Sequence, residues 1–246
     1  VMLFTLATCF GVGYFIGKAL GLNWKMSNLI SAGTGICGGS AIAAIAPVID
    51  ATDVDVAYGM SATFLFDMAM IVLFPILGRW LGLSDAAYGL WAGTAVNDTS
   101  SVVAAGYAFS EQAGDFATMV KLTRTLAIIP ITLVLALWRT HKAKTEQSKG
   151  GEAFSLKRAF PMFILYFVLA SIITTVCTTV GVPAGVFTPL KTLSKFFIVM
   201  AMAAIGMNTN IVKLVKTGGK PIFMGVCCWV AIACVSIAMQ HLLGFL

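Results

Sequence analysis

The sequence predicts an all-α polytopic membrane protein. Of its 246 residues, 59% are hydrophobic and only 11% are charged, and the mean hydropathy is +0.94. A soluble domain carries about 25% charged residues. The apolar segments are roughly 20 residues long, which is the length of a transmembrane helix rather than of a barrel strand. We therefore expect one transmembrane domain that covers residues 1–246.

The apolar segments predict about eight transmembrane spans. They cover residues 1–20, 28–49, 58–81, 88–109, 116–138, 159–180, 186–207 and 221–243. Lys and Arg gather in the loops after the first, third, fifth and seventh spans, whereas Asp and Glu follow the second and fourth. By the positive-inside rule this alternation predicts eight full crossings with Val1 outside. Re-entrant hairpins at the second or fourth span would put basic loops on both sides, so full crossings with internal breaks are expected.

Two of these spans contain a repeated motif with a polar or glycine-rich interruption. Residues 32–44 and 92–104 align without a gap at an offset of 60, and five positions are identical. The tripeptide Leu-Gly-Leu precedes both copies, at 20–22 and 81–83. The repeating unit is thus a helix followed by a broken helix, and the parity of the spans predicts that both copies have the same orientation. Interrupted helices are typical of transporter binding sites.

The interruptions predict a binding site near the middle of the membrane. An unpaired polar group in hydrocarbon costs several kcal/mol, so polar residues there face a cavity or bind something. A break also frees N–H groups at the start of the second half-helix, and these favour an anion. Hydrogen bonding between neighbouring helices, or close packing of Gly-Gly, would explain the same residues without a ligand. The predicted substrate-binding residues are Thr34, Cys37, Gly38, Gly39, Ser40, Thr94, Asn97, Asp98, Thr99, Ser100, Ser101, Lys121 and Arg124.

Two acidic residues are candidates for coupling transport to protons or sodium. Asp98 could bind the coupling ion, or it could cap the second half-helix. Asp67 lies in the third span and is either a partner in the polar centre or the pair of a cation. The six cysteines show no metal-ligand spacing, so no metal site or other cofactor is expected.

Basic residues inside the spans leave several alternatives open. Lys121 and Arg124 are three residues apart and share a helix face. They could line an anion path, form a salt bridge to Asp98, or extend to the membrane interface. A weaker example of the same arrangement is the pair Lys191 and Lys195. The segment 208–210 (Asn-Thr-Asn) is either a third break or a C-cap.

At these motifs the sequence resembles the YeiH-type family of bacterial inner-membrane proteins, which are described as sulfate exporters. The matching positions are residues 33–42, Asp98 with residues 102–106, Lys121 with Arg124, and residues 201–206. The resemblance implies a location in the bacterial inner (plasma) membrane. It also implies that about three N-terminal spans of a longer protein are missing from this chain. Some family members carry His-Glu at 97–98, so a proton-coupling role based on that His does not transfer here.

The expected function is therefore a secondary transporter that exports sulfate or sulfite, and not an enzyme. Its expected partners are a small anion, the lipid bilayer and a coupling proton or sodium ion, with homo-oligomerisation left open. The net charge of +6 is concentrated in loops, and no nucleic-acid partner is expected. The alternatives are a sodium/proton-type cation antiporter that uses Asp98 and Asp67, an intramembrane aspartyl-type enzyme, and a scaffold or sensor subunit.

Overall fold

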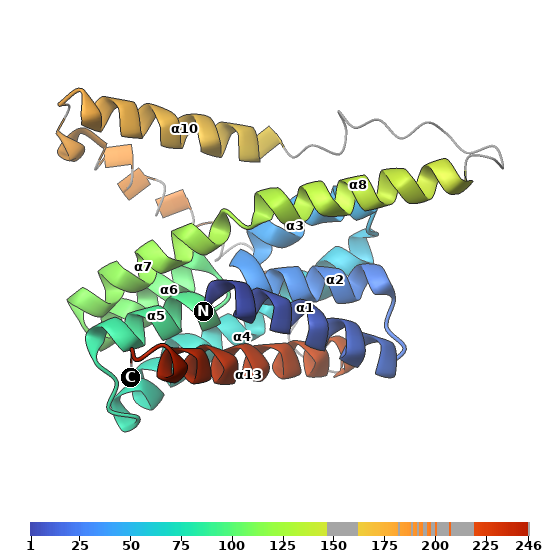
Figure 1. Ribbon diagram of the computed structural model, residues 1–246, viewed down its shortest axis with the longest axis horizontal. Helices are drawn as coiled ribbons and strands as arrows, with labels where there is room; N and C mark the ends of the chain where they lie inside the picture. Colours follow the sequence, from blue (N-terminus) through green and yellow to red (C-terminus); the bar gives the residue numbers. More distant parts are fainter. Residues whose placement is uncertain are drawn as a thin grey trace. The chain divides into compact units, whose positions relative to one another are not determined.

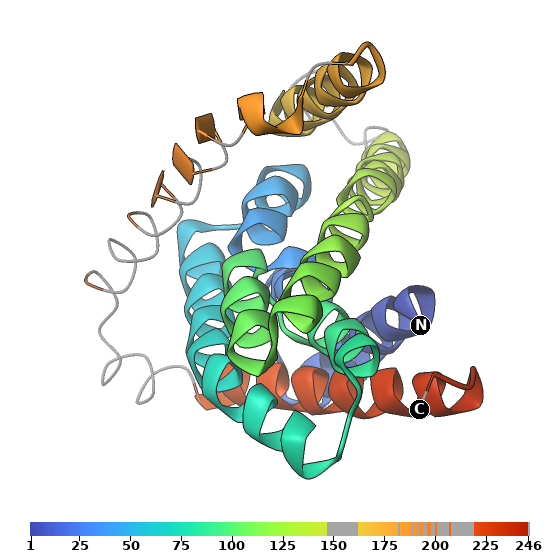
Figure 2. The ribbon, with the colours of Figure 1, turned by 90° about the vertical axis from the view of Figure 1, so that its left-hand side faces the viewer.

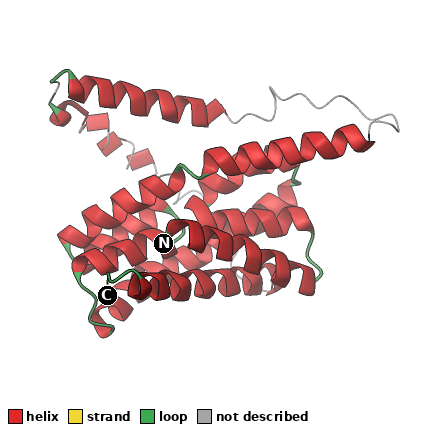
Figure 3. Cartoon of the chain, in the orientation of Figure 1, coloured by secondary structure: helices red, strands yellow, loops and turns green. Residues whose placement is uncertain are grey.

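The computed structural model describes residues 1–146, 162–181 and 219–245, with scattered positions between 183 and 207. Its regular structure is helical throughout these residues, as Figure 3 shows, which confirms the all-α prediction. The chain divides into two compact units, residues 1–154 with 212–246 and residues 155–211. Most of the predicted span 186–207, the pair Lys191 and Lys195, and segment 208–210 lie outside the described residues.

In the second unit, the structure describes one long apolar helix and a short turn. Helix α10 (Met162–Thr179) coincides with the predicted sixth span, and a single 3₁₀ turn (Ala184–Phe187) follows it. The predicted site residues all belong to the first unit.

In the part of the chain that the structure describes, four helical segments are long and apolar enough to cross a membrane. Two of them, α1 (Met2–Ala19) and α13 (Gly219–Leu242), lie side by side in both Figure 1 and Figure 2. Helices α7 (Glu111–Thr125) and α8 (Ile128–Glu146) follow each other closely and together supply one segment. The four segments are α1 (Met2–Ala19), α4 (Asp53–Trp80), Glu111–Trp138 and α13 (Gly219–Leu242).

Between these segments lie two interrupted helices. The first consists of α2 (Trp24–Ala32), a π-helical turn (Gly33–Cys37) and α3 (Gly39–Ile49). The second consists of α5 (Asp85–Ala95) and α6 (Thr99–Phe109). Both interruptions fall within the repeated motif, where the sequence predicts them.

Each interrupted helix folds back on itself instead of crossing. At the ends of α2 and α3, the Nζ of Lys25 donates to the backbone oxygen of Asp50 at 2.6 Å. At the ends of α5 and α6, the rings of Tyr88 and Phe109 stack with centroids 3.9 Å apart. A continuous crossing would place each pair roughly 30 Å apart. Both elements are therefore re-entrant hairpins, so the prediction of full crossings is wrong and the count of eight spans is not confirmed.

The positive-inside rule gave the wrong topology because a single arginine was the only basic residue assigned to the third loop. Near the end of α4, Arg79 is the basic residue that assigned the third loop to the inner side. Its Nη2 donates to the backbone oxygen of Ala108 at 3.1 Å, and its guanidinium lies 5.9 Å from the ring centroid of Phe109. Arg79 therefore holds the open end of the second hairpin.

Other basic residues mark the opposite end of the unit. Lys25 lies there, and the Nζ of Lys220 donates to the backbone oxygen of Leu20 at 3.0 Å. The rings of Trp24 and Trp138 meet at the same end, with centroids 5.5 Å apart. The positive-inside rule predicts that this end faces the cytoplasm, so Val1 is still expected outside.

The repeating unit is visible as a helix, a tight turn and a hairpin. Helices α1 and α4 end in the same motif, with Gly21 and Gly82 at φ of +67° and +63°. The next residue, Leu22 or Leu83, donates its N–H to the carbonyl of Gly17 or Gly78. This is the Schellman arrangement, which favours glycine at the left-handed position.

The two copies run in opposite directions. Helix α2 runs parallel to α4, since Leu29 faces Gly59 and Gly33 faces Thr63 four residues further along both helices. Helix α5 runs antiparallel to α4, because Tyr88 packs on Gly78 whereas Trp91, further along α5, stacks on the earlier Phe74. The prediction that both copies share one orientation is therefore wrong. Each hairpin returns to the side it started from, so the single helix α4 between them inverts the second copy.

Small residues allow α5, α6 and α7 to pack closely, as in many membrane helix pairs. The three helices lie side by side in Figure 1. A Cβ atom on Gly93 would lie 2.7 Å from Cγ1 of Val120 and 2.8 Å from the backbone oxygen of Ala117. A Cβ on Gly106 would lie 2.8 Å from the Cα of Gly114. Helix α7 is thereby held against both arms of the second hairpin.

We expect Gly93→Ala to destabilise the protein by about 1–3 kcal/mol, since overpacking forces backbone shifts. Gly59→Ala is the matched control, because a Cβ there would meet Cβ of Leu29 at an ordinary 3.4 Å. Thermal unfolding of both variants in detergent measures the difference. Equal unfolding temperatures would contradict the close α5–α7 contact.

Candidate functional site

The tips of the two hairpins meet at the middle of α4. Asp67 lies at the midpoint of this 28-residue helix, about 21 Å from either end. Its Oδ1 accepts the backbone N–H of Asp98 at 3.1 Å. The tip of the first hairpin, Gly38, packs on Asp98 as well, since a Cβ on Gly38 would lie 2.9 Å from Oδ1 of Asp98. We call this meeting point of Gly38, Asp98 and Asp67 the crossing.

The first tip combines a π turn with Gly38, whose backbone conformation favours glycine over other residues. The N–H of Gly38 closes the turn on the carbonyl of Gly33 at 2.8 Å, and π turns are frequent at functional sites. Gly38 has φ of +70° and ψ of −137°. Ser40 donates its hydroxyl to the backbone oxygen of Cys37 at 2.8 Å. Helix α3 then begins at Gly39 without a side-chain cap, so its first N–H groups have no acceptor from a capping side chain.

The second tip is capped by its own acid. The carboxylate of Asp98 accepts the backbone N–H of Ser100 at 2.9 Å and also the Ser100 hydroxyl. Helix α6 begins at Thr99 directly after this cap. Under the offset of 60, Asp98 is equivalent to Gly38. The two half-helices therefore differ, because the N-cap residue of α6 supplies a capping carboxylate, whereas the N-cap residue of α3 is a glycine with no side-chain cap.

Two cations from α7 bind both hairpins at equivalent positions. The Nζ of Lys121 donates to the backbone oxygens of Ile36 and Val96, both at 2.8 Å. The guanidinium of Arg124 donates to the backbone oxygens of Thr34, at 3.3 Å, and Thr94. Positions 36 and 96, like 34 and 94, are related by the offset of 60. We call this arrangement of Lys121, Arg124 and the four carbonyls the cationic clamp.

The clamp explains why two charges are tolerated inside the protein. The carbonyls at the end of a helix lack intrahelical partners, and the helix dipole favours a cation there. Lys121 and Arg124 are 0% and 1% exposed, so neither extends to the membrane interface. Among the described residues the one ion pair within 4.0 Å joins Lys25 and Asp50, so no direct salt bridge links either clamp cation to Asp98.

Several buried polar atoms around the tips have no hydrogen-bond partner within the described chain. A buried donor or acceptor without a partner costs about 1–3 kcal/mol, so these atoms are the candidates for contact with a solute or water. They belong to both hairpins, α4 and α7. The atoms are Oγ1 of Thr34, Oδ2 of Asp67, Oδ1 and Nδ2 of Asn97, Oγ of Ser101 and Nε of Arg124.

Helix α13 adds polar residues that the sequence analysis missed. The hydroxyls of Thr94 and Ser236 lie 2.6 Å apart, and Nε2 of Gln240 donates to the Ser236 hydroxyl at 3.4 Å. Ser236 and Gln240 are buried and one helical turn apart in the largely apolar helix α13. That spacing was the available signal. The Thr94 hydroxyl donates within α5, to the Leu90 carbonyl, so it accepts from Ser236, and this contact links α5 to α13.

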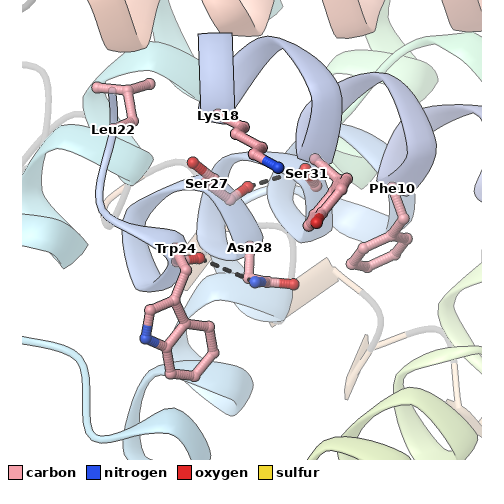
Figure 4. Close-up of a pocket in the computed structure, with 8 residues that line it drawn as sticks. Phe10, Lys18, Leu22, Trp24, Ser27, Asn28 and Ser31 are labelled. Atoms are coloured by element: carbon pink, nitrogen blue, oxygen red, sulfur yellow. Dashed lines mark hydrogen bonds between the residues drawn. The ribbon is translucent and has the colours of Figure 1, made fainter. Parts of the chain in front are cut away.

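A separate pocket lies between α1 and α2, away from the crossing. Figure 4 shows Lys18 and Trp24 at this pocket, a combination typical of the membrane interface. None of the predicted site residues lines it, so we place no substrate there. Its lining residues are Phe10, Tyr14, Lys18, Leu22, Trp24, Ser27, Asn28 and Ser31.

Known proteins resemble this chain over nearly its whole length. A family model described as "Conserved hypothetical protein 698" matches residues 1–225. A UPF0324 membrane protein of Streptococcus pyogenes serotype M18 is 55% identical over 248 residues, covering 99% of this chain and 73% of the relative. A UPF0324 membrane protein of Clostridium tetani is 49% identical over 253 residues, covering 99% of this chain and 72% of the relative. No solved structure matches this chain.

We expect Gly38→Ala to destabilise the protein by about 1–3 kcal/mol, because the backbone conformation is strained for an L-residue and the new methyl group meets Asp98. The neighbouring Gly39→Ala is the control, since its Cβ would meet only the Phe64 ring, at 3.3 Å. Thermal unfolding in detergent compares them. A larger loss in Gly39→Ala would contradict the tip geometry.

Removal of a clamp cation should cost more. Lys121→Met leaves the carbonyls of Ile36 and Val96 unpaired, so we expect a loss of about 2–5 kcal/mol. Lys18→Met removes the same charge from an exposed side chain and should be nearly neutral. If chemical denaturation in detergent gives both variants the stability of the wild type, the clamp does not hold the hairpins.

Proposed function

This chain belongs to the family described as conserved hypothetical protein 698, whose relatives are UPF0324 membrane proteins, and from that premise we propose that it is a secondary transporter of a small anion rather than an enzyme. The membership confirms the resemblance to the YeiH-type family and the multi-pass membrane location. The substrate that we propose is sulfate or sulfite.

One observation supports a transporter above the other functions. Two hairpins that start from opposite ends meet with their tips at the midpoint of α4. Inverted repeats that bring interrupted helices together near the bilayer midplane are the usual construction of a secondary transporter site. The proposed topology of the described first unit is four membrane-spanning segments with two re-entrant hairpins. Irregular backbone inside a membrane is tolerated where protein or a water-filled cavity surrounds it.

The charges at the crossing favour an anion at the start of α3. The free carbonyls at the tips already have Lys121 and Arg124 as partners, so the protein supplies its own cations there. The N-terminus of α6 has Asp98, whereas that of α3 has no capping side chain. Gly39 is half-buried and Ser40 is exposed, so a solute can approach these N–H groups. A tetrahedral oxyanion would accept hydrogen bonds from them.

Export is the direction that we propose, because the membrane potential assists it. The cytoplasm of a bacterium is electrically negative, and each elementary charge gains about 2.3 kcal/mol per 100 mV on crossing. A divalent anion such as sulfate gains twice that amount when it moves outward. The cytoplasmic end that the positive-inside rule predicts would then be the loading side.

A sodium/proton-type cation antiporter is the second candidate, and Asp67 is the observation that favours it. The Oδ2 atom of this buried carboxylate has no partner within the described chain, as expected of a group that exchanges a small cation. In this alternative Asp67 and Asp98 carry the ion and no anion binds.

We expect Ser101→Ala to lower anion flux about tenfold, equivalent to roughly 1.4 kcal/mol, without loss of stability. Its hydroxyl has no partner within the described residues, so its removal breaks no hydrogen bond recorded there. The measurement is uptake of radiolabelled sulfate and sulfite by proteoliposomes that contain the full-length protein, with and without a pH gradient.

Ser27→Ala is the matched control, because its hydroxyl is also buried and unpaired but lies at the pocket between α1 and α2. Flux of both anions equal to that of empty liposomes would overturn the anion proposal. Sodium-driven proton movement in the absence of either anion would favour the antiporter instead.

A further inference from the structure

We propose that Asp67 takes up and releases the coupling proton, and that Asp98 is a structural cap. This inference rests on the proposed transport function. It assigns proton coupling to one acid and helix capping to the other, two roles that the sequence could not separate. It follows from the hydrogen bonds of each carboxylate and from the position of each residue relative to the tips.

One oxygen of the Asp98 carboxylate caps the second hairpin. This oxygen accepts the N–H and the hydroxyl of Ser100, and the other lies against Gly38. The N-terminus of a helix favours a negative charge through its dipole and its free N–H groups. A proton on Asp98 would therefore weaken the start of α6, so Asp98 is poorly suited to exchange protons during transport.

Asp67 has the opposite properties. It is 1% exposed, its Oδ1 accepts the N–H of Asp98, and its Oδ2 has no partner within the described residues. The amide of Asn97, next to Asp98, is also buried and unpaired at both atoms. An ionised carboxylate inside a membrane is costly and marks proton and ion pathways. A proton on Oδ2 removes the charge without breaking a hydrogen bond recorded in the structure.

The surrounding groups couple this proton to an anion. Asp98, the N-cap residue of α6, and Lys121 of α7 are the charged residues that act on Asp67, and the Cys37 thiol lies at the facing tip. Helices α2, α5 and α13 have their charged residues near their ends, and α3 has none. With both acids ionised, they balance Lys121 and Arg124. A proton on Asp67 leaves one net positive charge, and the neutral carboxyl holds the N–H of Asp98 less strongly. The protonated crossing should therefore bind an anion more tightly.

Two isosteric variants separate the roles, since each removes one negative charge. Asp67→Asn keeps an oxygen for the Asp98 N–H, and Asp98→Asn keeps a good helix cap. The measurement is calorimetric binding of sulfate to the purified full-length protein, from mildly acidic to mildly alkaline pH, where sulfate keeps its double charge. We expect wild-type affinity to rise about tenfold as the pH falls. Asp67→Asn should bind tightly at every pH, and Asp98→Asn should keep the pH dependence. Loss of the dependence in Asp98→Asn with its retention in Asp67→Asn would overturn the inference.

A spectroscopic readout keeps the test independent of the substrate. Infrared difference spectra between low and high pH should show the carbonyl band of a protonated carboxyl group in the wild type and in Asp98→Asn, and this band should be absent from Asp67→Asn. If sulfate fails to bind to any variant, the proposed substrate fails while the infrared result still decides the role of Asp67. A band that persists in Asp67→Asn and disappears in Asp98→Asn would assign the proton to Asp98 and refute the proposal.

Discussion

The first unit depends on one electrostatic constraint. The carbonyl groups that lose their intrahelical partners at the two hairpin tips need donors from elsewhere in the protein. Lys121 and Arg124 supply them from α7, at positions of the two motifs that are equivalent under the offset of 60. Without these cations, both tips would bury unpaired carbonyls. The close contacts of α7 with the second hairpin, through Gly93 and Gly106, place the two cations at the correct depth.

The inverted repeat makes the crossing nearly symmetric. Function can arise from the one difference between its two halves, which is the cap of the second half-helix. Both tips release carbonyls to the same clamp, and both second half-helices start near the midpoint of α4. One of them has the fixed carboxylate of Asp98, whereas the other begins at Gly39 with no capping side chain. A symmetric pair of caps would leave no electrostatic reason for a solute to bind. The difference between Gly38 and Asp98 leaves the N-terminus of α3 without a capping side chain, while Asp67 accepts the backbone N–H of Asp98 at the other tip.

The sequence predicted the candidate site better than the path of the chain. The offset of 60 located both interruptions, and the polar residues within the apolar segments identified the tips, Asp67 and the clamp cations. Periodicity and composition are local, so they indicate where a helix is interrupted but not whether it continues or turns back. Counting charges in the loops gives the wrong topology because Arg79 does not mark the cytoplasmic side. Its guanidinium binds the carbonyl of Ala108 at the open end of the second hairpin.

By itself, the sequence determined that this protein is a helical membrane protein with a duplicated, interrupted element and a small set of charged residues inside the bilayer. Those properties follow from hydropathy and from the cost of polar groups in hydrocarbon. Only the tertiary structure decided that the interruptions are hairpin tips, that the copies are inverted, and that Asp98 caps a helix while Asp67 keeps an unpaired oxygen. These outcomes depend on contacts such as Tyr88 on Phe109 and Lys25 on Asp50, between residues that local patterns treat as unrelated.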